Sequence, residues 1–175
     1  MRFSRSLLAL MLVPSVLAFA KAAPPALAWS GPPWISIELP GNPWDRYGRD
    51  AYLFVHAFHH GTPTAFPVTG TAEGIVGGER KSIPLTFQRT DRDGVYALSN
   101  QWGSTGEWTL VITVSQATDD VAQAIVQVNA AGKVFAVDVP TREVQGRPFP
   151  RRMTAQEVEA TLRNRPVVAA GPVRD

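Results

Sequence analysis

The chain of 175 residues contains no cysteine. This absence excludes disulfides, iron–sulfur clusters, thiolate zinc sites and cysteine nucleophiles. It also excludes a lipid-modified cysteine at a processed N-terminus. Histidine and methionine are scarce as well, with three residues of each. We therefore expect no bound cofactor, and the hydrophobic core alone must stabilise the domain that the chain forms.

The chain also lacks an apolar run of the length that a comfortable membrane span requires, which is about 20 residues. An apolar stretch from Leu7 to Ala20 follows Arg2 and Arg5, and Ala-x-Ala triplets come next. A positive end, a short apolar middle and small residues at the exit are the three parts of a secretory signal peptide. We predict a signal peptide over residues 1–22, with cleavage as late as residue 28, and no stable membrane span after cleavage.

A surplus of basic charge is missing once the predicted signal peptide is removed. Three of the 17 Lys and Arg residues lie in the signal, so 14 remain against 15 Asp and Glu. Nucleic-acid binding usually needs a basic face, so we expect no nucleic-acid partner. Residues 141–175 do form a basic tail, with seven Lys or Arg against four Asp or Glu. This tail is expected either to lie on its own domain, to stay solvated, or to touch an anionic surface.

Proline and strand patterns divide the rest of the chain. Residues 23–33 are a proline-rich leader, because proline fixes φ and cannot continue a helix. Between residues 34 and 140, about eight short segments have strand-like patterns and are separated by turn residues. We predict an antiparallel all-β sandwich. Its expected strands are 34–39, 51–60, 69–76, 81–89, 95–102, 107–115, 121–129 and 133–139.

A single helix is predicted near the C-terminus. Thr154 and Glu157 have the spacing of a capping box, in which each side chain satisfies a free backbone amide of the other residue. Val158 and Leu162 follow one turn apart, so we expect a helix over residues 155–164. A helix of two to three turns is marginal alone. It is therefore expected either to dock on the sandwich or to fray.

The histidines are clustered. His56, His59 and His60 lie within five residues, and histidine is the commonest metal ligand. On one strand, however, His56 and His60 lie about 13 Å apart at ~3.3 Å per residue, and His59 faces the other way. A copper or zinc site therefore requires His59 and His60 to lie in a turn and a carboxylate to join them. Candidate carboxylates are Asp45, Asp50 and Glu73.

The five tryptophans suggest a stacking surface for sugar rings. Trp108 begins the most regular alternating strand, so we assign it to the core. Trp44 lies in a polar connection next to Asp45, where a surface contact is expected. Trp102 lies at a predicted strand end beside a glycine-rich loop, where we expect a half-exposed ring. Trp44 and Trp102 are the candidate ligand contacts, and burial in the core is the alternative for the set.

Motifs of catalysis are not found. The sequence has no Gly-x-Ser-x-Gly nucleophile elbow and no His-Glu-x-x-His metal helix. The glycine-rich stretch 70–82 lacks the P-loop spacing, and aspartate pairs at 91/93 and 119/120 lie in predicted turns. We expect a protein without enzymatic activity.

Two strand motifs lie between residues 91 and 115. Asp93-Gly94-Val95-Tyr96 contains Gly-x-Tyr, and the segment from Gly106 to Leu110 reads Gly-x-Trp-x-Leu. This pair resembles bacterial immunoglobulin-like envelope domains and is most similar to the YtkA-like and FixH-like group. The resemblance implies an immunoglobulin-like fold in which Tyr96 anchors a strand corner.

These patterns together predict an immunoglobulin-like antiparallel β-sandwich of about eight strands, over residues 34–140, with a short C-terminal helix. We expect an exported, non-enzymatic binding or interaction module of the bacterial cell envelope, periplasmic or secreted. A bacterial setting is favoured because small secreted eukaryotic domains usually contain disulfides. The expected partner is an envelope protein or a polysaccharide. The alternative function is a periplasmic metal-binding domain that uses the histidine cluster.

Overall fold

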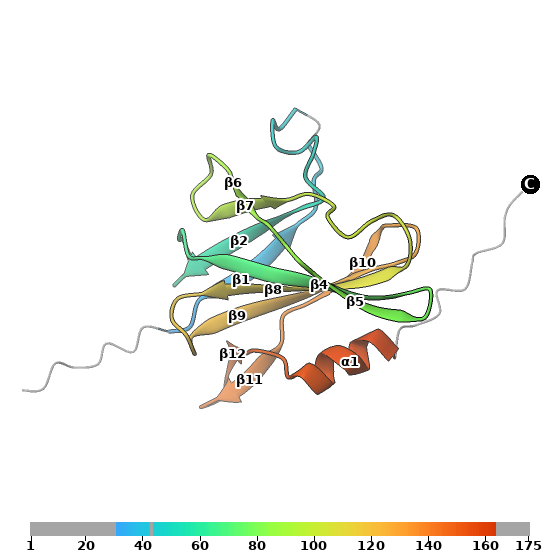
Figure 1. Ribbon diagram of the computed structural model, residues 1–175. Helices are drawn as coiled ribbons and strands as arrows, with labels where there is room; N and C mark the ends of the chain where they lie inside the picture. The colour runs from blue at the N-terminus through green and yellow to red at the C-terminus, as the bar shows by residue number, and fades with distance from the viewer. Residues whose placement is uncertain (1–30, 43, 164–175) are drawn as a thin grey trace, which may run out of the picture. The chain divides into compact units, whose positions relative to one another are not determined.

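A computed structural model describes residues 31–42 and 44–163. Within these residues, two five-stranded antiparallel sheets pack face to face, and a hairpin and one helix lie beside the second sheet (Figure 1). The predicted all-β sandwich is confirmed. The predicted signal peptide and most of the leader 23–33 lie outside the described residues.

The strand order defines the two sheets. The first sheet has the order β1-β2-β7-β6, with β3 paired to β2. Its strands are β1 (Trp34–Glu38), β2 (Leu53–His59), β3 (Thr62–Pro63), β6 (Gln88–Arg89) and β7 (Val95–Leu98). The second sheet has the order β10-β9-β8-β4-β5. Its strands are β4 (Val68–Val76), β5 (Glu79–Pro84), β8 (Glu107–Ser115), β9 (Val121–Val128) and β10 (Val134–Asp138).

The core lies between the two sheets and follows the two-residue alternation of the strands. In β8, alternate residues are buried against the first sheet, as the sequence predicts. Burial of each large aliphatic side chain stabilises the folded state by about 1.5–3 kcal/mol. The core includes Trp108, Leu110, Ile112 and Val114 from β8, and Ile35, Leu53, Val55, Ala57 and Leu98 from the first sheet.

The single strand predicted over residues 81–89 is wrong. β5 ends at Pro84, Leu85 is buried, and β6 belongs to the first sheet rather than the second. The Leu85 N–H donates to the Gly70 carbonyl at 2.9 Å as the chain leaves the second sheet. Proline has no N–H for the strand ladder, so Pro84 marks the point where the chain changes sheets.

Tyr96 does not form the strand corner that the resemblance implies. Such a corner joins a tyrosine hydroxyl to the backbone a few residues upstream. Here the Tyr96 hydroxyl donates to the Phe66 carbonyl oxygen, 30 residues earlier, at 2.6 Å. The bond instead connects β7 to the segment that leads into β4.

The C-terminal part of the described chain contains a hairpin that the sequence patterns do not predict. β11 (Thr141–Val144) pairs with β12 (Arg147–Pro150). Gln145 and Gly146 connect them, with φ angles of 52° and 74°. Two consecutive residues with positive φ form the turn that best suits a tight hairpin. Gln145 is an unusual residue at such a position, which explains why the turn is hard to recognise.

The helix α1 (Ala155–Arg163) begins at the predicted capping box. The Thr154 N–H donates to Glu157 Oε2 at 2.8 Å, and the Glu157 N–H donates to Thr154 Oγ1 at 3.2 Å. The helix docks rather than frays, since it contacts β4 and β8 and buries Leu162 to 7 % exposure. Residue 164, the predicted last residue of the helix, lies outside the described part of the chain.

A polar network connects α1 to the outer face of the second sheet. Arg80 binds Glu73 at 2.6 Å and Glu159 of α1 at 2.8 Å. Burial alone raises the pKa of Glu73, but hydrogen bonds from Thr71, Ser82 and Arg80 outweigh it and lower that pKa overall. Arg80 thus joins a buried strand carboxylate to the helix.

The helix N-terminus should be sensitive to acid. The Arg151 guanidinium and then the Thr154 amide lower the pKa of Glu157 from 4.5 to about 2. A lowered pKa in the folded state means that the stabilising contribution is complete above pH 4.5 and is lost as the pH falls toward 2. We expect Glu157→Gln to lower the melting temperature at pH 7. The difference from the wild type should shrink between pH 4.5 and pH 2, and a constant difference in thermal melts would contradict this assignment.

Candidate functional site

The outer face of the first sheet carries a second apolar cluster, separate from the main core. Phe54, Val95 and Ala97 form it. Phe54 is 1 % exposed although its side chain points away from the core. It is covered because Tyr47, in the connection between β1 and β2, packs against the cluster. We call residues 44–50 of this connection the Trp44 loop.

Local hydrogen bonds give the Trp44 loop its shape. The Asn42 side-chain oxygen accepts from the Trp44 N–H at 2.9 Å, and Asp45 Oδ1 accepts from the Tyr47 N–H at 2.9 Å. Both are contacts across two residues, the spacing at which Asn and Asp stabilise turns. The Ala51 N–H then donates to the Tyr47 carbonyl at 3.0 Å. The sequence of the loop therefore folds it back toward the sheet.

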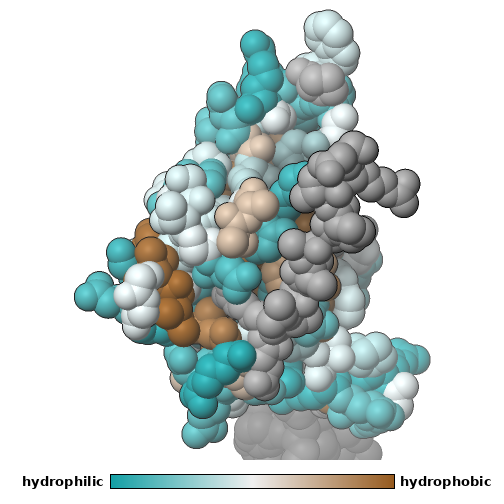
Figure 2. All heavy atoms as spheres, turned by 90° about the vertical axis from the view of Figure 1, so that its right-hand side faces the viewer, coloured by the Kyte–Doolittle hydropathy of each residue, from teal (hydrophilic) through white to brown (hydrophobic). Residues whose placement is uncertain are grey.

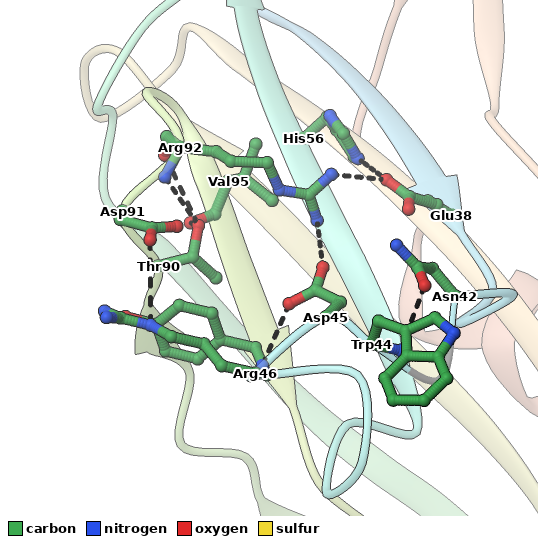
Figure 3. A network of polar contacts seen from close by, with 11 residues as sticks. Glu38, Asn42, Trp44, Asp45, Arg46, His56, Thr90, Asp91, Arg92 and Val95 are labelled. Carbon is green, nitrogen blue, oxygen red and sulfur yellow. Dashed lines mark hydrogen bonds and ion pairs between the residues drawn. The ribbon is translucent and has the colours of Figure 1, made fainter.

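Figure 3 shows how charged side chains connect the Trp44 loop to the strands. The Arg92 guanidinium lies 4.7 Å from the centre of the Phe54 ring. It also pairs with Glu38 at 3.1 Å and with Asp45 of the loop at 3.9 Å. Glu38 in turn lies 2.6 Å from His56 Nε2. One cation thus connects β1, the loop and the turn before β7.

A second ion pair positions Arg46, the residue after Asp45 in the Trp44 loop. Arg46 lies 3.6 Å from Asp91, and its guanidinium stacks 4.6 Å from the centre of the Tyr47 ring. The contact with Tyr47, above all a hydrogen bond to its hydroxyl oxygen, raises the pKa of Arg46, and the charge of Asp91 adds to this effect. Ion pairs that are exposed to water contribute little to stability. We therefore assign these contacts to positioning of the loop rather than to overall stability.

A cavity of about 640 Å³ lies on this face, with a lining from the Trp44 loop, β6, β7 and the segments beside them. Its volume falls within the range of about 300–1,000 Å³ that is usual for small-molecule sites. We call it the outer-face cavity. Its polar lining residues are Arg46, Asp50, Thr86, Gln88, Ser99 and Gln101.

One wall of the outer-face cavity is held in place by a pair of hydrogen bonds. Gln101 Nε2 donates to the Thr86 carbonyl at 2.7 Å, and Gln101 Oε1 accepts from the Thr86 N–H at 2.9 Å. The carboxamide keeps a second N–H and a second lone pair for other partners. A side chain that is already fixed loses little entropy when it binds a ligand.

The chemistry of the lining favours binding of a polar ligand. The nine lining residues include one cation and one carboxylate, and none of them is histidine, cysteine or lysine. The remaining polar groups are carboxamides and hydroxyls, which donate and accept hydrogen bonds. The arrangement therefore suits recognition through hydrogen bonds.

The three candidate metal ligands do not come together. His56 points to the outer face and binds Glu38, whereas His59 lies on the opposite side of β2, with its ring 5.9 Å from that of Phe66. His59 and His60 are neighbours, with ring centres 4.2 Å apart. Within residues 31–42 and 44–163, no group of three or more His, Cys, Asp or Glu side chains is placed to hold a metal ion. The metal-binding hypothesis gains no support from this arrangement.

The two candidate tryptophans have opposite environments. Trp44 is 91 % exposed, as expected for a surface contact. Trp102 is only 4 % exposed and packs edge-on against Tyr52, with ring centres 4.9 Å apart. The expectation of a half-exposed Trp102 is wrong, because β7 ends at Leu98 and the following loop turns this ring into the core.

Apart from Asp50, a candidate carboxylate for a metal site, the residues that line the outer-face cavity are not predicted from the sequence. The sequence patterns predict only a polar connection around Trp44 and one strand over residues 81–89. A signal was present in the loop, where Trp44 and Tyr47 flank the charged residues Asp45 and Arg46. Two aromatic residues in a charged connection indicate either a covered apolar patch or a contact surface. In this loop Tyr47 covers the Phe54 cluster, and Trp44 is exposed.

The surface shown in Figure 2 is mostly hydrophilic, and strongly apolar side chains gather in one small area of that face. Within the described residues, no helix combines the length and the apolar composition needed to cross a bilayer. Among residues 31–42 and 44–163, the large hydrophobic side chains that are exposed belong to Trp34, Leu39, Trp44, Ile75 and Val137.

Comparisons with protein-family models, with curated proteins and with solved structures find no match. The similarity of residues 91–115 to the YtkA-like and FixH-like group therefore stays a prediction from the sequence.

Proposed function

We propose that this protein is an exported binding module of the bacterial cell envelope and that the outer-face cavity is its binding site. The observation that carries the proposal is the cavity of about 640 Å³ with its largely polar, hydrogen-bonding lining. The signal-like N-terminus and the lack of cysteine support the export of the chain to a bacterial periplasm or medium. The proposal includes the fold type, an immunoglobulin-like sandwich.

The construction of the site supports binding. The Trp44 loop supplies Arg46, Tyr47 and Asp50, and ion pairs and turns hold that loop against the sheet. Gln101 on the opposite side is fixed by the Thr86 backbone. Groups positioned before a ligand arrives bind it with less loss of entropy. The ligand in this proposal is a component of the envelope, either a protein or a polysaccharide.

Filling the cavity should abolish binding without unfolding the protein. Ser99 is exposed at the cavity wall, so Ser99→Trp places a large ring into the open space. We expect the affinity for whole envelope material, measured by co-sedimentation of the purified protein, to fall more than about tenfold. The protein is purified after expression of the full chain, so that any signal peptide is processed by the cell.

The matched control is Ser104→Trp, the same change at an exposed loop residue that does not line the cavity. This variant should bind as the wild type does, and both variants should have melting temperatures close to that of the wild type. Equal binding by Ser99→Trp and the wild type would overturn the proposed site.

A further inference from the structure

The lining of the outer-face cavity indicates which chemical class of ligand it binds. This inference about the ligand rests on the proposed function, because it concerns the same cavity. Gln88 and Gln101 are carboxamides, and Ser99 and Thr86 carry hydroxyls. Each of these side chains both donates and accepts hydrogen bonds. Their best partners are ligand groups that also both donate and accept hydrogen bonds. The hydroxyls of a sugar are such groups.

The charges of the lining favour a neutral ligand. Arg46 and Asp50 contribute one positive and one negative charge. Arg46 is also paired with Asp91 at 3.6 Å, just outside the lining. A charged ligand needs an opposite charge that is still available, because desolvating an unpaired charge is costly. Among the lining residues themselves the positive and negative charges are equal in number, so the lining offers a ligand no surplus charge of either sign.

The walls of the cavity combine flat and small apolar surfaces with the polar groups. Two flat groups, the Arg46 guanidinium and the Tyr47 ring, lie together at one side, with the guanidinium over the ring and 4.6 Å from its centre. Ala51 and Ala97 add small apolar side chains. A pyranose ring has an apolar face of C–H groups and an edge of hydroxyls. Sites that accept such ligands combine apolar surface with a few well-placed polar groups.

The Trp44 loop carries a second aromatic side chain, outside the lining of the cavity. Trp44 lies two residues before Arg46, and Figure 3 shows the two side chains on either side of Asp45. The Trp44 indole is 91 % exposed, so its faces are accessible. An indole that is exposed in the free protein is well suited to stack on a further sugar of the same chain.

We propose that the outer-face cavity binds a neutral sugar unit of an envelope polysaccharide. Gln88, Ser99 and Asp50 bind its hydroxyls. The stacked Arg46 and Tyr47 pair faces the sugar ring, and Trp44 contacts a neighbouring unit of the polysaccharide.

The test uses polysaccharide extracted from the envelope of the organism that encodes the chain. One portion is treated with protease, and a second portion is treated with periodate, which cleaves bonds between adjacent hydroxyl-bearing carbons. Binding is measured for the wild type, Gln88→Leu, Ser99→Trp and the control Gln156→Leu. Gln156 is exposed on α1 and does not line the outer-face cavity. Circular dichroism melts of each variant verify that it is folded.

Binding should survive protease and high salt and be lost after periodate. Gln88→Leu should weaken it about tenfold, the effect of losing one or two neutral hydrogen bonds, while Gln156→Leu should leave it unchanged. Binding that survives periodate but not protease, and that Ser99→Trp still blocks, would overturn the sugar assignment while leaving the proposed function in place. Binding that salt abolishes would overturn the neutrality of the ligand. Binding that Ser99→Trp does not affect would overturn the proposed function itself.

Discussion

Replacing Trp108 with alanine is expected to lower the free energy of unfolding by about 3–5 kcal/mol. The indole is 2 % exposed and lies in the core between the sheets. Its Nε1 donates to the Thr105 carbonyl at 3.0 Å, so the substitution also leaves a backbone acceptor without its partner. The backbone of β4 packs directly on the ring, because a Cβ added at Gly74 would lie 2.7 Å from it. Little can move into the space that the ring leaves.

Chemical denaturation of the Trp108→Ala variant measures this loss. Trp44→Ala is the matched control, since an indole that is 91 % exposed contributes little to the core. Its effect should stay within about 0.5 kcal/mol. A loss below about 1 kcal/mol for Trp108→Ala would contradict the place of this residue in the core.

Gly94→Ala is expected to destabilise the protein by about 2–5 kcal/mol, the sum of backbone strain and a steric clash. Gly94 has a φ of +66°, which side chains with a Cβ rarely adopt. The added Cβ would also lie 2.7 Å from both the Ala57 carbonyl oxygen and the Thr64 nitrogen. These are backbone atoms, so relief of the clash requires β2 and the segment after β3 to shift.

The variant Gly61→Ala measures the cost of backbone strain alone, without a steric clash. Gly61 also has a positive φ, of +78°, but a Cβ there would meet nothing within 4 Å. We expect it to cost only the strain of about 1–2 kcal/mol. The two variants are compared by urea denaturation. If Gly94→Ala and Gly61→Ala lower the free energy of unfolding equally, β2 does not approach Gly94 as closely as described.

The parts of the fold that the sequence predicted depend on local patterns. The alternation of Trp108, Leu110 and Ile112 assigns β8 and its buried side, because side chains on a strand point to alternate faces. The capping box at Thr154 and Glu157 likewise determines where α1 begins. In both cases the signal lies within a few residues of the structure that it specifies.

The features that the sequence did not predict depend on residues far apart in the chain. Thr109 alternates with apolar neighbours as an outward residue should, yet it is fully buried. Trp102 is buried partly by Tyr52, which lies 50 residues earlier. Periodicity reports which face a residue occupies but not what later covers that face.

The outer-face cavity illustrates the same limit for the site. Its lining comes from three segments, at residues 46–51, 86–88 and 97–101. They meet only because the chain changes sheets after Pro84 and β6 pairs with β7. An interpretation of residues 81–89 as one strand removes β6 from the first sheet and with it one wall of the cavity. The histidine cluster, in contrast, was conspicuous in the sequence, but His56 and His59 lie on opposite faces of β2 and His60 lies beyond its end.

The most direct test of the binding site is a chemical-shift map of the isotope-labelled protein, titrated with the envelope polysaccharide. Binding at the outer-face cavity predicts that the shifted amides cluster at residues 44–51, 86–88 and 97–101. Amides of α1 and of the β11–β12 hairpin, on the other sheet, should keep their positions. Shifts concentrated at α1 or the hairpin, or no shifts at saturating polysaccharide, would contradict the assignment of this cavity as the binding site.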